Sequence, residues 1–183
     1  LAIRGPQDVA WIGLKLENER AWSLAPTAMD FYDGLPGVAF FLGYLTAVDP
    51  AGGQADLAAA ALTTMLRSAE DMGGSCRSIG AFAGWGGVVY TLAHLGILLD
   101  RPTLVQRAED LVDQIAPLID QDEDLDVIGG AAGAIGSLAA LHHIAPSART
   151  VATLRRCGER LVVRAKPMLT GIGWPLHGAS ALL

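Results

Sequence analysis

The sequence has little positive charge and no cluster of basic residues. It holds 13 lysines and arginines beside 19 aspartates and glutamates, for a net charge of −6. Nucleic-acid binding depends largely on basic side chains that neutralise phosphates, so the composition argues against a nucleic-acid partner. Long apolar runs are missing as well. The longest, residues 38–48 and 88–99, are too short to cross a bilayer, and no signal sequence is recognisable, so we expect a cytoplasmic protein with no strong membrane signal.

Cysteine is also scarce, with only Cys76 and Cys157, far apart in the sequence. A single pair in a chain of this length is not a disulfide framework, which favours a reducing compartment. Neither a C-x-x-C nor an H-x-x-x-H spacing occurs. We expect Cys76 in a loop and Cys157 in the core, and we therefore assign no metal ligand within these residues.

What the chain has in abundance is apolar residues, 51% of the total, and glycine, with 22 residues. Residues 8–26 alternate between apolar and polar side chains around a polar turn, a pattern typical of a β-hairpin. After Asp30 the pattern becomes helical. We therefore divide the chain into a β-hairpin lead-in at residues 1–28 and a helical domain at residues 29–183.

The helical part repeats itself. Residues 30–37 (DFYDGLPG), 80–87 (GAFAGWGG) and 126–133 (DVIGGAAG) each carry a G-x-x-G at the start of an apolar helix. Amphipathic helices are predicted between them, at residues 54–72, 103–119 and 148–166. The second of these is expected to begin with a capping box, Thr103-x-x-Gln106, and the third follows Pro146-Ser147.

Helices that are apolar almost all round should be buried on all sides, whereas amphipathic helices keep one face in water. Their alternation predicts an inner and an outer layer. We therefore predict an all-α protein, an α/α toroid of which about half is present, with three helix-pair repeats and the short N-terminal β-hairpin.

The glycines suggest where a site lies. If the three inner helices begin at one end of the ring, their free N–H groups and positive dipole ends face a shared cavity mouth, which suits acidic catalytic groups or an anionic intermediate. One alternative is that the glycines serve helix packing alone. Another is that Asp30 and Asp33 mainly cap helices. The candidate cavity-lining residues are Asp30, Asp33, Gly34, Gly37, Gly84, Gly87, Gly130 and Gly133.

The three glycine motifs, in this order, resemble the first three repeats of the LanC-like lanthionine cyclases. Residues 2–6 (AIRGP) and 11–14 (WIGL) resemble the bifunctional class II, or LanM-type, synthetases, in which a dehydratase domain precedes the cyclase. The resemblance implies an α/α toroid whose central zinc is held by two Cys and one His of the C-terminal repeats. It also implies a dehydrated precursor peptide as substrate, whose Cys thiolate adds to dehydroalanine or dehydrobutyrine to form lanthionine rings in lantibiotic biosynthesis.

Two residues of this chain match catalytic positions of the family. Asp126 matches the Asp of the D-V-I-x-G motif and is our candidate for proton transfer; the alternative is a cap for a helix that begins near Gly129. His177, in residues 174–180 (WPLHGAS), is the nearest match to the family's catalytic His. It lacks the preceding Gly-Phe and has Ala181 in place of a glycine, so the family's His is expected beyond residue 183. His142 and His143 close an inner helix and are interpreted as structural.

No position here matches the family's zinc ligands, so we expect zinc in the full-length domain and none in these residues. Alone they are predicted to be inactive and to associate with one another through exposed apolar edges. Two other functions stay open. One is a LanC-like protein that binds or adds glutathione without forming rings, and the other is a helical-repeat scaffold that binds a partner and does no chemistry.

Overall fold

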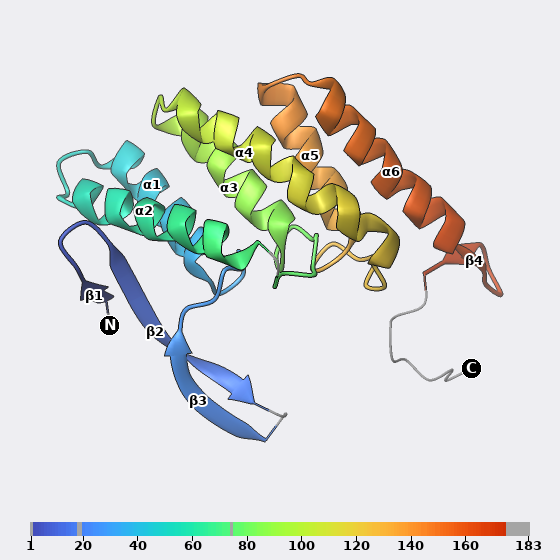
Figure 1. The fold of residues 1–183 in the computed structure, drawn as a ribbon, viewed down its shortest axis with the longest axis horizontal. Coiled ribbons are helices and arrows are strands. Elements are labelled where there is room, and N and C mark those ends of the chain that lie inside the picture. Colours follow the sequence, from blue (N-terminus) through green and yellow to red (C-terminus); the bar gives the residue numbers. More distant parts are fainter. Residues whose placement is uncertain (1, 18–19, 74, 175–183) are drawn as a thin grey trace.

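The computed structural model describes residues 2–17, 20–73 and 75–174, and His177 lies outside them. In this part of the chain a small antiparallel sheet is followed by six α-helices in two layers (Figure 1). The arrangement is that of part of an α/α toroid with an N-terminal hairpin, as predicted. None of the helices in the described part is long and apolar enough to cross a membrane.

The sheet contains the predicted hairpin and one strand more. β2 (Val9–Glu17) and β3 (Ala21–Pro26) pair with Leu14 opposite Leu24, while β1 (Ala2–Arg4) pairs with the start of β2. The strand order is β1-β2-β3. The start of β2 lies against α2, where the backbone N–H of Val9 donates to Thr64 Oγ1 over 3.0 Å, and β3 with the far part of β2 extends away from the helices in Figure 1. A second, two-stranded ribbon follows the last helix, formed by β4 (Lys166–Pro167) and β5 (Ile172–Gly173).

The predicted alternation of helices is confirmed. The inner layer consists of α1 (Leu35–Val48), α3 (Trp85–Leu98) and α5 (Ala131–Ile144). The outer layer, in front of it in Figure 1, consists of α2 (Ala55–Met72), α4 (Pro102–Ile115) and α6 (Ala148–Arg164). Because the inner helices lack a charged face and the outer ones have one, only this layering buries the apolar surface of both.

Burial on all sides nearly holds for α3, in which Ile97 close to the end is 63% exposed, but it is wrong for α1. The side chains of Trp85, Val88 and Leu92 in α3 are buried in the core. In α1, however, Phe41 is 63% exposed and Val48 is 81% exposed. The reason is position: α3 packs between α1 and α5, whereas α1 is flanked by one inner helix among the described elements. Apolar side chains of α6, Val162 and Val163, are likewise exposed.

The capping box predicted at Thr103 and Gln106 is wrong. Helix α4 begins one residue earlier, at Pro102, with Arg101 at the N-cap position and no side-chain cap. Proline suits this place because its fixed φ fits the first helical turn, where its missing N–H is not needed. The same helix ends earlier than predicted and continues as a 3-10 turn, η1 (Ala116–Gln121), in which Pro117 cannot donate an α-helical hydrogen bond.

Candidate functional site

The loops that precede the three inner helices meet at one end of the layer, as predicted. We call residues 28–34, 78–84 and 122–130 together the loop end. The N–H of Phe31 donates to the carbonyl of Phe82 over 2.7 Å, which joins the first loop to the second. The second loop joins the third through several bonds, among them Gly80 N to Gly129 O at 2.8 Å and Ala81 N to Val127 O at 3.1 Å.

The second glycine of each G-x-x-G motif is required by a close backbone approach. A Cβ atom on Gly37, Gly87 or Gly133 would lie less than 3.0 Å from the carbonyl oxygen of the second residue of its own motif. These oxygens belong to Phe31, Ala81 and Val127. Only glycine lets each loop fold back so tightly over the start of its helix.

The first glycine of each motif lies equally close to loop backbone. A Cβ on Gly34 would meet Asp30, one on Gly84 would meet Ser78, and one on Gly130 would meet Leu125. Gly84 also has a φ of 144°, which side-chain-bearing residues rarely adopt. The glycines therefore serve close packing of the loop end, the alternative that the sequence had left open, and Gly133 additionally lines a pocket described below.

The prediction that free N–H groups of the inner helices face a cavity is wrong for α3 and α5. At the start of α3, Gly86 N donates to Ile79 O and Gly87 N to Gly80 O. At the start of α5, Gly133 N donates to the carbonyl of Asp126 over 3.1 Å. Because each loop folds back over its helix, its carbonyl groups satisfy donors that a helix N-terminus normally leaves open.

Asp126 caps a turn within the third loop of the loop end. Its Oδ1 accepts a hydrogen bond of 2.8 Å from Gly129 N, and its side chain is half-buried. The helix itself begins later, at Ala131, with Gly130 as N-cap and no side-chain cap at that position. The bond fixes the Asp126 carboxylate relative to the loop that carries Val127.

Asp30 repeats this geometry in the first motif. Its Oδ1 accepts from Asp33 N over 2.9 Å, the same spacing as between Asp126 and Gly129. Burial raises the pKa of the Asp30 carboxyl, and the N–H of Asp33 opposes the shift. Asp33 itself is exposed. The equivalent position in the second motif is Gly80, so carboxylates stand at the first and third loops.

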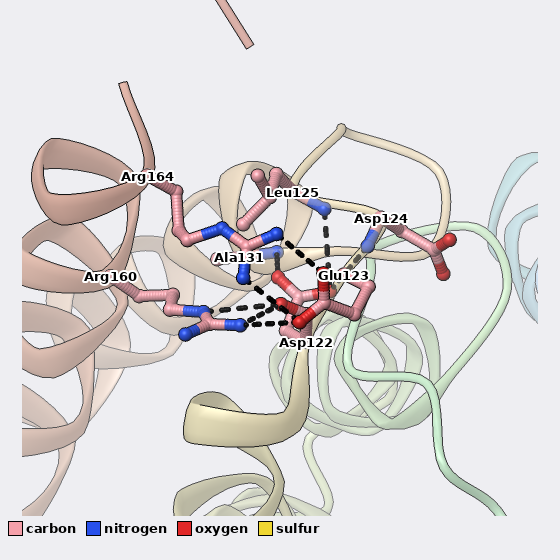
Figure 2. A network of polar contacts seen from close by, with 7 residues as sticks. All are labelled: Asp122, Glu123, Asp124, Leu125, Ala131, Arg160 and Arg164. Carbon is pink, nitrogen blue, oxygen red and sulfur yellow. Dashed lines mark hydrogen bonds and ion pairs between the residues drawn. The ribbon is translucent and has the colours of Figure 1, made fainter. Parts of the chain in front are cut away.

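The third loop is held by a residue that the sequence analysis missed. Asp122 is only 7% exposed, and its carboxylate accepts three backbone N–H groups (Figure 2). Oδ2 accepts from Ala131 N, the first residue of α5, over 2.8 Å. Oδ1 accepts from Asp124 N and Leu125 N over 3.1 and 3.3 Å. Asp122 therefore fixes both ends of the loop that carries Asp126.

Helix α6 secures the same loop from the outer layer. Arg160 Nε donates to the carbonyl of Asp122 over 3.1 Å, and its Nη2 pairs with Glu123 at 3.1 Å. Arg164 also binds Glu123, with 2.9 Å from Nη1 to Oε1 (Figure 2). Only 14% of the Arg160 side chain is exposed, so its pairing is better shielded than those on the surface. Leu125, whose N–H donates to Asp122, has a φ of 61°, which is uncommon for a leucine.

A pocket of about 500 Å³ opens between the loop end and the three inner helices. Val127, directly after Asp126, is part of its lining. The other walls are mostly aromatic or small, and they include Phe31, Phe40, Phe82, Tyr90, Gly136 and Ser137. The aromatic residues of this inner pocket come from the first two loops and from α1 and α3. The site thus combines a fixed carboxylate with an adjacent apolar cavity.

Metal ligands are not gathered in this part of the chain. Among residues 2–17, 20–73 and 75–174, no group of three or more His, Cys, Asp or Glu side chains could hold a metal ion. Cys76 lies in a loop, half-buried, and its thiol donates to the carbonyl of Ser78 over 3.4 Å. Cys157 is fully buried in the core. Both placements agree with the sequence analysis.

The two thiols should differ in reactivity. Burial, together with the negative charge of Asp122, raises the pKa of Cys157 to about 12. Because only the thiolate is alkylated, we expect Cys157 in the folded protein at pH 8 to react with iodoacetamide at least about 100-fold more slowly than in the urea-unfolded protein. Cys76, whose pKa burial also raises, should react faster than Cys157. Peptide mass spectrometry over a time course measures both rates, and equal rates in the folded state would contradict the placement of Cys157.

Two helical layers with glycine loops gathered at one end define the class of protein as an α/α toroid. The chain belongs to the lanthionine synthetase C-like family, whose model matches residues 25–178. The match includes all three glycine motifs and all six α-helices of the described part, but only the end of the hairpin. Among proteins with curated descriptions, none matches the chain. Membership indicates a function related to lanthionine synthesis.

Proposed function

We propose that this chain is part of a cytoplasmic LanM-type synthetase, in which it contributes to the peptide cyclase that forms lanthionine rings in a dehydrated precursor peptide. The observation that carries the proposal is the Asp126 carboxylate, fixed by Gly129 N at the loop end beside a pocket large enough for a peptide side chain. Membership of the lanthionine synthetase C-like family supports the reaction type.

In the proposed reaction, a cysteine of the substrate adds across the double bond of a dehydroalanine or dehydrobutyrine in the same peptide. The sulfur–carbon bond forms at the β-carbon, and the electrons of the double bond move into an enolate. The Asp126 carboxylate accepts the thiol proton and returns a proton to the α-carbon. Atoms and electrons balance without an oxidant, because the product is an isomer of the substrate.

In this proposal the loop end stabilises the negative charge of the reaction through helix dipoles, and not through hydrogen bonds donated by backbone N–H groups. The positive dipole ends of α1, α3 and α5 converge there, and a negative thiolate or enolate gains from that field. The N–H groups that would otherwise bind such an anion are used by loop carbonyls and by Asp122. We therefore assign stabilisation to the field and proton transfer to Asp126.

The zinc ion that the family resemblance implies has no donor set among the described residues. We propose that its ligands lie elsewhere in the protein. His177, the second proposed proton-transfer residue, lies outside the described residues, so the structure assigns it no contact.

The test is an Asp126→Asn variant of the natural polypeptide that contains this chain. Asparagine keeps the Oδ1 acceptor for Gly129 N, so the turn should persist while the proton acceptor is lost. We expect the rate of ring formation to fall by about 10²- to 10⁴-fold, the usual contribution of a positioned acid–base group. Rates are measured by alkylating the remaining thiols of a dehydrated peptide at timed intervals.

A matched control is Asp120→Asn, since the Asp120 side chain is 80% exposed and pairs only with Arg156 in the described part. It should cyclise at the wild-type rate. Cyclisation by the Asp126 variant within threefold of wild type would show that this carboxylate does not carry the proton transfer.

A further inference from the structure

The aromatic walls of the inner pocket are arranged so that a further aromatic ring could pack against them. Phe31 stands edge-on to Phe40, with ring centroids 5.3 Å apart at 73°, and edge-on to Tyr90, at 5.9 Å and 89°. Phe40 and Tyr90 are stacked at 5.8 Å. The rings come from a loop and two helices, so the pocket offers both faces and edges of rings. A further ring entering it would find the offset and edge-to-face contacts that aromatic pairs prefer.

The floor of the pocket holds a hydroxyl without a partner in the described part of the chain. Ser137 in α5 is 2% exposed, and its Oγ makes no hydrogen bond there. A buried hydroxyl left unpaired costs free energy, and a helical serine can usually avoid this by donating to the carbonyl one turn earlier. Thr91 in the neighbouring helix α3 does so, donating to Gly87 O over 2.9 Å. Ser137 therefore retains hydrogen-bonding capacity for a molecule that occupies the pocket.

The pocket also owes its space to a glycine that no contact explains. Gly136 lies in the middle of α5, where glycine weakens a helix relative to alanine. A Cβ on Gly136 would meet nothing within 4 Å, in contrast to Gly133 one turn earlier, whose Cβ would lie 2.5 Å from Ala81 N. A larger residue would fit the fold and fill the pocket. The absence of a side chain here keeps the cavity open.

From these three observations we infer that the inner pocket is a subsite for an aromatic side chain with a polar tip, such as that of tyrosine, whose polar atom pairs with Ser137 Oγ. The inference rests on the proposed function in that the guest is a side chain of the peptide being cyclised. Val127 lines the pocket and Asp126 precedes it, so the aromatic residue would lie close in sequence to the reacting cysteine or dehydrated residue.

Binding can be tested without any cyclisation. The probes are p-cresol and toluene, the side-chain analogues of tyrosine and phenylalanine, titrated against the natural polypeptide and followed by saturation-transfer NMR. We expect saturable binding of both probes, with p-cresol several-fold tighter. Gly136→Leu should weaken both at least tenfold by filling the pocket. Ser137→Ala should weaken p-cresol to the level of toluene and leave toluene unchanged.

The matched control for the filled pocket is Gly158→Leu. Gly158 is also helical, and a Cβ added to it would meet nothing within 4 Å, but it lies in α6, outside the pocket lining. This variant should bind both probes as wild type does. Thermal denaturation of each variant checks that Gly136→Leu stays folded, and its midpoint should not fall, since leucine favours a helix more than glycine does.

The inference is overturned if the wild type shows no saturable binding, or if Gly136→Leu binds both probes as the wild type does. It is also overturned if Ser137→Ala discriminates between p-cresol and toluene as the wild type does. Since none of these readouts involves ring formation, they separate failure of the subsite from failure of the proposed activity. If both hold, Gly136→Leu should raise the KM for a tyrosine-containing substrate while kcat changes little.

Discussion

Replacement of Asp122 by alanine is expected to lower the free energy of unfolding by about 4 kcal/mol, because each buried donor left without an acceptor costs about 1–3 kcal/mol. Three backbone N–H groups, those of Asp124, Leu125 and Ala131, would lose their common acceptor. The start of α5 and the loop that carries Asp126 would both be released. Urea unfolding followed by circular dichroism measures the change.

The control for this prediction is Asp120→Ala. Asp120 is close in sequence and also pairs with an arginine of α6, but its side chain is 80% exposed. An exposed ion pair contributes about 0–1 kcal/mol, so this variant should stay within that range of the wild type. A loss at Asp122 no larger than that at Asp120 would show that the buried carboxylate does not organise the loop.

Replacement of Gly133 by alanine is expected to cost about 3 kcal/mol, the upper part of the usual range for overpacking a well-packed site. The new Cβ would strike the Val127 carbonyl and lie 2.5 Å from Ala81 N, and both are backbone atoms of the loop end. Neither can turn aside as a flexible side chain could. Two loops would have to move together, so the disturbance should reach Asp126 as well.

Gly158→Ala provides the comparison, because a Cβ at Gly158 in α6 meets nothing within 4 Å. The same chemical change should there stabilise the protein by about 0.5–1 kcal/mol, since alanine has less conformational freedom to lose. In urea unfolding, we expect the free energy of unfolding to fall for Gly133→Ala and to rise for Gly158→Ala. Destabilisation of equal size at both positions would mean that the close loop approach is not what requires Gly133.

The sequence predicts the layers of this fold because the signal is local. A G-x-x-G precedes each inner helix, and a charged face marks each outer helix. The same patterns do not reveal how a loop returns over its helix, so the expectation that the N–H groups of Gly86 and Gly133 are free is wrong. That outcome depends on hydrogen bonds between loops distant in the sequence, which no periodicity records.

Asp122 could not be singled out from its neighbours in the sequence. Residues 120–126 (DQDEDLD) contain five acidic residues, a composition that normally indicates a solvated segment. The 3-10 turn η1 ends at Gln121, and Asp122 directly after it is buried, whereas Asp120 and Asp124 stay exposed. Arg160 and Arg164, one turn apart in α6, were the available hint, because paired arginines on one helix face often meet acidic partners.

Part of the aromatic lining of the inner pocket could be predicted from the sequence. Phe40 and Tyr44 in α1, and Tyr90 and His94 in α3, are each four residues apart and so share a helix face. The rings do meet across the two helices, with Phe40 and His94 5.7 Å apart. What the sequence does not show is that Phe31 and Phe82 of the loops close the end of this aromatic surface beside Asp126.

Closure of a thioether ring by the protein that contains this chain can be measured on a synthetic peptide. The natural polypeptide is incubated with zinc and a synthetic peptide that contains one cysteine and one dehydrobutyrine, and the peptide is then treated with iodoacetamide. We expect a peptide of unchanged mass that no longer takes up the alkylating group, because its thiol has become a thioether. A peptide that remains fully alkylated, or one whose mass rises by that of glutathione when this thiol is supplied, would contradict it.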